Sequence, residues 1–252
     1  MGKFLTRTAL FGIVAVAIVA IIRFAAAPEI SFTKPPVSAG RSAVATRVSS
    51  TSKSPPSHPP SSRRTAASVR IAVPFSPQAP FAEWDPLHEE ACEEMALIMV
   101  KHYWDETPLS RTQAESELQE LIAWEHAHGY GDDVSMAQLK EIAREYYGLK
   151  AEVLTEVSIS AIKQRVARGE PLIVPAAGRD LGNPYFTGLG PWYHMLVVTG
   201  YDGTHFITND PGTRRGEGYR YRYDVLLNAI HDWTGVKEEI RKGAKAILVV
   251  TR

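Results

Sequence analysis

The stretch Glu89–Val100, which reads EEACEEMALIMV, contains Cys92, the only cysteine among the 252 residues of the chain. Its apolar residues Met95, Ile98 and Met99 recur at the spacing of a helix with one buried face. Glutamates crowd the start of the stretch, where the positive end of a helix dipole favours carboxylates. The pattern therefore predicts a helix that begins at or near Cys92 and ends near Trp104.

The predicted position of Cys92 bears on its reactivity. A thiol at a helix N-terminus has a lowered pKa and forms thiolate, the reactive species. The neighbouring glutamates oppose this, because negative charge nearby disfavours a second negative charge. A reactive Cys92 therefore requires a cation close by, and the alternative interpretation is a buried structural cysteine.

The N-terminal residues 1–27 have the pattern of a signal anchor or a signal peptide. Lys3 and Arg7 precede an apolar run that is long enough to span a bilayer if Arg23 reaches the far interface. We favour an uncleaved transmembrane anchor, because Pro28 is a poor residue after a cleavage site. The basic residues place the N-terminus in the cytoplasm and the remainder outside. A cleaved signal would instead give a secreted protein.

Residues 28–68 are rich in Ser and Pro and lack a hydrophobic period, which predicts a disordered linker. Residues 69–252 have a globular composition and the size of one domain. The net charge of zero gives no indication of a nucleic-acid partner. The sequence therefore predicts an anchor, a linker and a single globular domain.

The order of the predicted elements favours an α+β fold. A strand is expected over 69–75, and helices over 92–104, 110–128, 135–148, 158–168 and 223–233. Ser110 or Thr112 is expected to cap the second of these helices. Thr112 with Glu115, and Ser135 with Gln138, have the spacing of capping boxes. Further strands are expected over 151–154, 171–176, 193–200, 204–209 and 246–251. Helices thus come first, and an antiparallel sheet forms late in the chain.

His194 and Asp210 lie on the hairpin predicted from Asp202-Gly203. A three-residue loop, Tyr201 to Gly203, would place Gly200 opposite Thr204 and His194 opposite Asp210. Directly opposed side chains share a face of the sheet, so the carboxylate can orient the imidazole. A two-residue loop would oppose His194 with Pro211 instead. The alternative is a purely structural His–Asp pair.

With Cys92, this pair would supply nucleophile, base and orienting carboxylate. Gln78, in a proline-stiffened loop before Cys92, carries a carboxamide that can stabilise a developing oxyanion together with the Cys92 backbone N–H. Aromatic residues before Cys92 and in the loop over 178–192 are predicted to contact substrate: Trp84, Tyr185, Phe186 and Trp192. No metal or organic cofactor is expected.

In the order Gln, Cys, His and Asp, the chain resembles papain-like cysteine peptidases, specifically the bacteriocin-processing (double-glycine leader) branch in a stand-alone form. The matching segments are 73–78, 91–96, 194–202 and 209–212. The resemblance implies a papain-like fold, with the nucleophile helix packed on the late sheet. It also implies Cys92 as nucleophile, His194 as base, Asp210 as orienting residue, Gln78 as oxyanion donor, and a peptide or protein as substrate.

The chain departs from that family at two places. Glu93 follows the cysteine, where the family most often has Gly, and Trp84-Asp85-Pro86 lengthens the interval between Gln78 and Cys92. The leading hypothesis is a membrane-tethered, extracytoplasmic cysteine peptidase or amide hydrolase. Two alternatives stay open: an inactive module that binds peptide or cell-wall material, and a thiol acyl or amide transferase.

Overall fold

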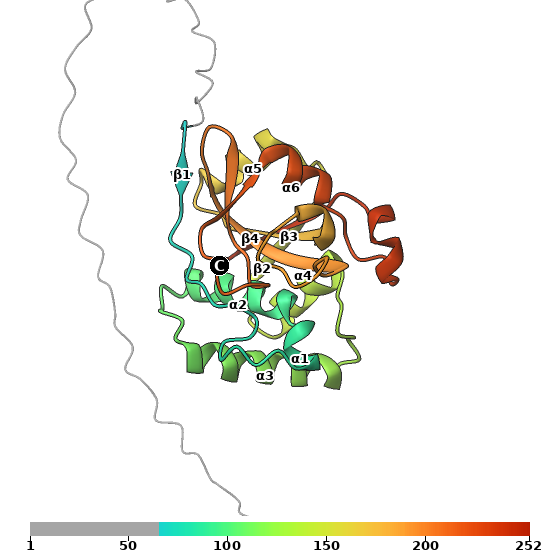
Figure 1. Ribbon diagram of the computed structural model, residues 1–252. Coiled ribbons are helices and arrows are strands. Elements are labelled where there is room, and N and C mark those ends of the chain that lie inside the picture. Colours follow the sequence, from blue (N-terminus) through green and yellow to red (C-terminus); the bar gives the residue numbers. More distant parts are fainter. Residues whose placement is uncertain (1–65) are drawn as a thin grey trace, which may run out of the picture. The chain divides into compact units, whose positions relative to one another are not determined.

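The computed structural model describes residues 66–252, and the predicted anchor and the linker up to residue 65 lie outside this part (Figure 1). None of the helices within residues 66–252 combines the length and the apolar character needed to cross a bilayer. The boundaries predicted for the anchor and the linker therefore stay predictions.

Within residues 66–252 the strands form an antiparallel sheet of seven strands in the order β2-β7-β3-β4-β5-β6, with β1 paired to β4. The six strands of the main path are β2 (Lys150–Leu154), β3 (Leu172–Ala177), β4 (Tyr193–Tyr201), β5 (His205–Asn209), β6 (Tyr219–Arg222) and β7 (Ile247–Thr251). Strand β4 is buried along its whole length. It carries His194 and lies next to the middle of the sheet.

Helices cover both faces of the sheet (Figure 1). One face packs against α2 (Cys92–Trp104) and α4 (Met136–Glu145), and α3 (Arg111–Ala127) packs against α2. The core there includes Met95, Leu97 and Met195. The other face packs against α5 (Ile159–Val166) and α6 (Tyr223–Ala229), around Leu196 and Phe206. Alternate residues of β4 thus enter opposite cores, as the two-residue period of a strand requires.

Local hydrogen bonds define the helix starts. Helix α4 begins with the predicted capping box of Ser135 and Gln138, whereas the box of α3 joins Ser110 to Gln113. The prediction that Thr112 and Glu115 form a box is therefore wrong. Helix α2 begins at Cys92, as predicted, but its N-cap is Ala91, whose side chain accepts no hydrogen bond. Backbone N–H groups of its first turn are consequently without a side-chain cap.

Several element predictions need correction. Strand β1 covers only Val69–Arg70, although we predicted a strand over 69–75. Strand β6 and helix α1 (Pro86–Glu89) were not predicted, nor were the 3₁₀ turns η1 (Gly178–Leu181) and η2 (Lys237–Lys242). Helix α6 ends at Ala229 rather than at 233. Strand β1 depends on its pairing with the distant strand β4, whereas α1 has a local N-cap, Asp85.

The predicted register of the β4–β5 hairpin is also wrong. Tyr201 lies opposite Phe206. Val197 lies opposite Asn209, whereas the predicted register pairs Val197 with Ile207. The turn is longer because the Asp202 carboxylate accepts the N–H groups of Thr204 and His205, at 2.8 and 2.9 Å. An irregularity between Val198 and Gly200 shifts the pairing further. Neither the three-residue loop nor the two-residue alternative describes this turn.

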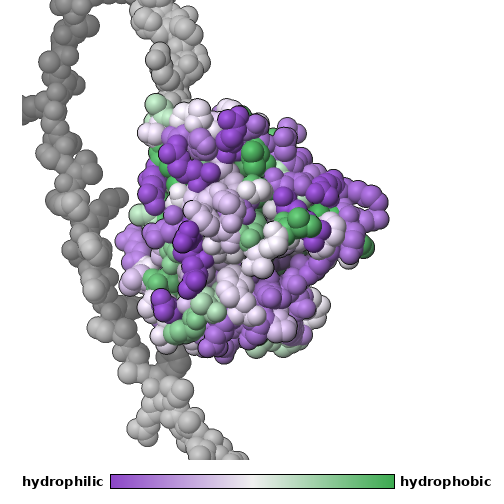
Figure 2. All heavy atoms as spheres, viewed as in Figure 1, coloured by the Kyte–Doolittle hydropathy of each residue, from purple (hydrophilic) through white to green (hydrophobic). Residues whose placement is uncertain are grey.

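Hydrophobic residues are mostly collected in the two cores, and the face of the molecule in Figure 2 is largely hydrophilic with isolated hydrophobic residues. Among the exposed large aromatic residues are Trp84, with 41% of its surface accessible, and Tyr185, with 44%. Both belong to the cavity described next, so their exposure coincides with the place where a ligand would bind.

Candidate active site

A cavity of about 780 Å³ opens beside the N-terminus of α2. It is lined by Cys92, by His194 at the start of β4 and by Gln78 from the loop after β1. All four aromatic residues predicted to contact substrate also line it: Trp84, Tyr185, Phe186 and Trp192. Residues that the sequence separates by more than a hundred positions therefore meet at one concave surface.

His194 and Asp210 are hydrogen-bonded even though the predicted strand register is wrong. The distance from His194 Nε2 to Asp210 Oδ1 is 2.7 Å, and both side chains are buried. At the Val197–Asn209 pair, next to the site, the observed register differs from the predicted one by two residues. A two-residue shift keeps the side chains at that end of the hairpin on their original faces. With Nε2 engaged by the carboxylate, Nδ1 is the ring atom left to face a thiol.

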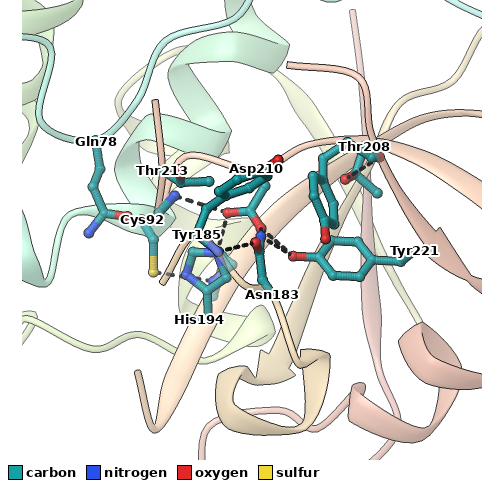
Figure 3. Close-up of polar contacts among 12 residues, drawn as sticks. Gln78, Cys92, Asn183, Tyr185, His194, Thr208, Asp210, Thr213 and Tyr221 are labelled. Carbon is teal, nitrogen blue, oxygen red and sulfur yellow. Dashed lines mark hydrogen bonds and ion pairs between the residues drawn. The ribbon is translucent and has the colours of Figure 1, made fainter. Parts of the chain in front are cut away.

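The Asp210 carboxylate is held by donors at both of its oxygens (Figure 3). Oδ1 accepts from His194 and from the Gly212 N–H at 3.0 Å. Oδ2 accepts from Asn183 Nδ2 at 3.1 Å and from the Tyr221 hydroxyl at 2.5 Å. Burial by itself raises the pKa of Asp210, but the His194 charge and the bonds from His194, Tyr221 and Gly212 outweigh it and hold that pKa below its usual value.

Asn183 and Tyr221 are site residues that sequence reasoning missed. Asn183 lies in the loop over 178–192 and also donates to the Tyr221 hydroxyl oxygen at 2.8 Å. Tyr221 is on β6, whose sequence Tyr219–Arg222 alternates Tyr and Arg. That alternation is the signal of a half-buried strand and could have revealed β6. No local signal marks Asn183.

His194 is also positioned by close packing. The Phe186 ring meets the imidazole edge to face, with 5.3 Å between ring centroids. Gly212 approaches the imidazole so closely that a Cβ there would lie 2.8 Å from His194 Cε1 and 3.0 Å from Phe186 Cε1. A glycine is therefore required beside the base for steric reasons, independently of its backbone angles.

Cys92 and His194 point toward one another in Figure 3. Cys92 Sγ accepts the N–H of Met195, the residue after His194, at 3.2 Å. Sγ also donates to Glu93 Oε2 at 2.8 Å. Burial raises the pKa of the Cys92 thiol well above its ordinary value, and Glu93 raises it further through its charge and this hydrogen bond. The opposing effect of the glutamates, expected from the sequence, is thus present in the structure.

Gln78 lines the cavity, but its amide group is already engaged. Nε2 donates to the backbone carbonyls of His88 at 2.8 Å and Glu89 at 3.0 Å. These carbonyls lie at the end of α1, where helix geometry leaves carbonyl groups unpaired. The Trp84-Asp85-Pro86 segment builds that helix, with Asp85 as its N-cap. The predicted role of Gln78 as oxyanion donor stays a prediction, and it requires these bonds to be released.

Cationic side chains also border the cavity. Arg214, Arg215 and Lys237 line it, and the Arg215 guanidinium lies 4.9 Å from the centroid of the Tyr185 ring. Glu89 and Glu90 line it too. Within residues 66–252, no group of three or more His, Cys, Asp or Glu residues is placed to hold a metal ion.

Comparison with known proteins identifies the class. The model of a family described as "Peptidase_C39 like family" matches residues 70–240. A Bacillus anthracis crystal structure described as a C39-like peptidase shares 16% sequence identity, covers 73% of this chain and 98% of its own, and superposes with a TM-score of 0.48. No curated protein matches the chain.

The mixed helices and antiparallel sheet, together with the family match, define a cysteine peptidase with an α+β papain-like fold. The chain belongs to the Peptidase C39-like family. The sequence-based predictions of the fold class, of the family and of a cysteine-type peptidase are thereby confirmed.

Proposed function

We propose that this protein is a membrane-tethered, extracytoplasmic peptidase or amide hydrolase in which Cys92 is the nucleophile, His194 the general base and Asp210 the orienting residue. The observation that carries the assignment is the buried hydrogen bond of 2.7 Å between His194 Nε2 and Asp210 Oδ1, beside the cavity that Cys92 also lines. The bond fixes the proton on Nε2 and leaves Nδ1 as the acceptor.

The reaction follows from this arrangement. His194 Nδ1 takes the Cys92 proton, and Asp210 stabilises the resulting imidazolium. The thiolate attacks the scissile carbonyl carbon, and the C–N bond breaks as the imidazolium returns its proton to the leaving amine. Water, deprotonated by His194, then cleaves the thioester, which releases the carboxylic acid and restores the thiol. Every proton lost by one group is taken up by another.

The developing oxyanion needs a donor. The Cys92 backbone N–H at the uncapped start of α2 is available for this role, since the Ala91 side chain makes no cap. The Gln78 amide becomes a second donor when it leaves the carbonyls of His88 and Glu89. Substrate binding against the Trp84 side of the cavity is the event that we expect to release it.

The cavity suits a peptide segment with apolar and acidic groups. Aromatic side chains bury apolar substrate surface, and Trp84 and Tyr185 are already exposed to receive it. Arg214 and Arg215 provide positive charge at the same surface. A peptide or protein is therefore the proposed substrate, and no nucleic acid is expected as a partner.

A cysteine-reactive probe tests the assignment. The full-length protein should be labelled at Cys92 at neutral pH, and His194→Ala should lower the rate of labelling strongly while the fold is retained. Hydrolysis of fluorogenic peptides should be lost in Cys92→Ala. Equal labelling of the wild type and of His194→Ala would contradict the triad. A new amide formed with an added amine, without net hydrolysis, would identify a transferase.

One contact favours the second candidate, an inactive binding module. The Cys92 thiol donates to Glu93 Oε2 at 2.8 Å, an arrangement that opposes thiolate formation if Glu93 is ionised. An inactive module would bind peptides without cleaving them. Its Cys92 would react with the probe no faster than a cysteine in a denatured chain.

The proposed tether rests on the sequence of residues 1–27. Fractionation of cells that express the full chain tests it. The anchor predicts that the protein stays in the membrane pellet after extraction with alkaline carbonate. Recovery of a soluble form that begins at Pro28 would show instead that the segment is a cleaved signal.

A further inference from the structure

Glu93 is in direct contact with the nucleophilic sulfur. It follows Cys92 in the first turn of α2 and has no exposed surface. Its Oε2 lies 2.8 Å from Cys92 Sγ, and within residues 66–252 its Oε1 has no hydrogen-bond partner. A buried carboxyl with an unpaired oxygen is costly, so its place beside the reacting atom calls for a functional reason.

The surroundings of Glu93 contain several other acidic groups. Glu94 on α2, Glu125 on α3, Asp133 before α4 and Tyr193 on β4 all interact with it electrostatically. The nearby cation Lys237 is bonded to Glu90 at 2.7 Å and to Asp133 at 3.5 Å. An ionised Glu93 would thus add a buried charge to a cluster of carboxylates.

The neutral acid is consequently the favoured form of Glu93. Burial, followed by the Glu94 charge, raises the pKa of Glu93 well above its usual range. Burial likewise raises the pKa of Glu125 to about 7, with the Glu93 charge contributing in the same direction. The cluster therefore holds protons at a pH where exposed carboxyls have lost theirs.

The two forms of Glu93 act on the thiol in opposite ways. An ionised Glu93 accepts the thiol hydrogen and keeps the nucleophile as S–H. A neutral Glu93 can donate its own O–H to a thiolate, and hydrogen bonding to a charged form favours that form. In the neutral case the Sγ proton passes to His194 Nδ1 and Glu93 retains its proton, so no proton leaves the site.

We propose that Glu93 is a further catalytic residue that donates a hydrogen bond to the Cys92 thiolate as a neutral acid. When Glu93 loses its proton to solvent, the His194 imidazolium returns its proton to the sulfur, and the nucleophile is again the unreactive thiol. The proposal rests on the proposed role of Cys92. The sign of the pH dependence follows directly: reactivity is present while Glu93 is protonated and is lost as the pH rises through the pKa of Glu93.

Alkylation of the full-length protein by iodoacetamide measures this reactivity without any substrate. Because the chain has a single cysteine, the rate reports on Cys92 alone. An ordinary thiol reacts faster as the pH rises. Here the wild-type rate should first fall as the pH rises through the raised pKa of Glu93, before the rise that any thiol shows at high pH.

Glu93→Gln is the decisive variant, because its amide still donates to the sulfur but cannot ionise. It should lose the fall in alkylation rate. At a pH above that fall it should react about tenfold faster than the wild type, if the thiol pKa of the two proteins differs by one unit. Glu94→Gln is the matched control from the same helical turn. Its alkylation rate should still fall with rising pH, at the same pH as in the wild type or a lower one, because removal of a neighbouring negative charge makes Glu93 easier to ionise.

A wild-type rate that rises steadily with pH would overturn the proposal, and so would a Glu93→Gln profile that coincides with the wild type. If Glu93→Gln does not fold, the pH profiles of the alkylation rate for the wild type and Glu94→Gln still test the proposal, because the proposal predicts a fall in rate with rising pH in both. His194→Ala separates the proposed role of Glu93 from the proposed triad. If His194→Ala leaves the alkylation rate unchanged, the proposed triad is wrong. If His194→Ala lowers the rate but the wild-type rate shows no fall with rising pH, only the proposed role of Glu93 is wrong.

Discussion

The two sides of the candidate active site differ in how completely their polar atoms are paired. On the base side, both oxygens of Asp210 accept hydrogen bonds, from His194, Gly212, Asn183 and Tyr221. On the nucleophile side, Gln78 Oε1 and Glu93 Oε1 have no partner within residues 66–252, and the thiol bonds to Oε2 of the Glu93 carboxyl group.

This difference indicates which part of the site is ready for catalysis. A fully bonded carboxylate is rigid and needs no reorganisation when His194 becomes charged. The nucleophile side must change its hydrogen bonds or its protonation before a thiolate forms. The following predictions test this contrast through the base side, from the largest expected effect on turnover to the smallest.

Asp210→Asn should have the largest effect. Asn is nearly the same size, so the packing should persist, but its amide can donate to His194 and favour the wrong tautomer. The corresponding change in serine proteases lowers turnover about 10⁴-fold, and the loss here should approach that value or be smaller, since a thiolate–imidazolium pair needs less support. Peptide hydrolysis and circular dichroism measure the two effects. Near-wild-type turnover would show that the carboxylate is dispensable.

Gly212→Ala should lower turnover about 100-fold, because displacement of a catalytic group by about 1 Å has an effect of that size. The added methyl would lie 2.8 Å from His194 Cε1, so the ring must move. Gly203→Ala in the β4–β5 turn is the matched control, since a Cβ there meets no atom within 4 Å. Equal activities of the two variants would mean that the imidazole tolerates the displacement.

Tyr221→Phe should lower turnover about tenfold, because it removes one hydrogen bond to a charged acceptor and leaves the others. It should also raise the pKa of Asp210, since the Tyr221 bond helps to lower it. A carboxyl with a lowered pKa stabilises the fold above its unfolded-state pKa, and this stabilisation is lost as the pH falls through the folded-state pKa. Acid unfolding should therefore begin at a higher pH in the variant.

Tyr219→Phe is the control for this experiment. The Tyr219 ring neighbours that of Tyr221, with 4.7 Å between centroids, but its hydroxyl does not bond to Asp210. Its acid unfolding curve and its turnover should match the wild type. An identical shift in both variants would mean that aromatic packing, and not the bond to Asp210, is responsible.

Asn209→Ala should have the smallest effect on turnover, within a few-fold of the wild type. Asn209 faces away from His194, where Nδ2 donates to the Val73 carbonyl at 3.0 Å and Oδ1 accepts the Gly218 N–H at 3.2 Å. Loss of these buried bonds should lower the free energy of unfolding by about 1–3 kcal/mol. Thermal melting measures this loss. A large fall in turnover with unchanged stability would place Asn209 in the site.

Much of the fold follows from local patterns. The apolar period after Cys92 and the box of Ser135 and Gln138 predict α2 and the start of α4, because such hydrogen bonds and packing faces repeat within a few residues. The turn after Tyr201 shows the limit of this reasoning. Its length depends on the Asp202 side chain, so the sequence located the hairpin but not its register.

The sequence by itself determined which chemical groups are present and in what order: one thiol, His194 on a buried strand, and Asp210 after the next strand. Only the tertiary structure decided their partners. It directs the Gln78 amide to the carbonyls that end α1, and it brings Asn183 and Tyr221 to Asp210. The reason is physical. Secondary structure follows from contacts within a few residues, whereas the hydrogen bonds of a buried polar group are made with any segment that the packed core brings near it.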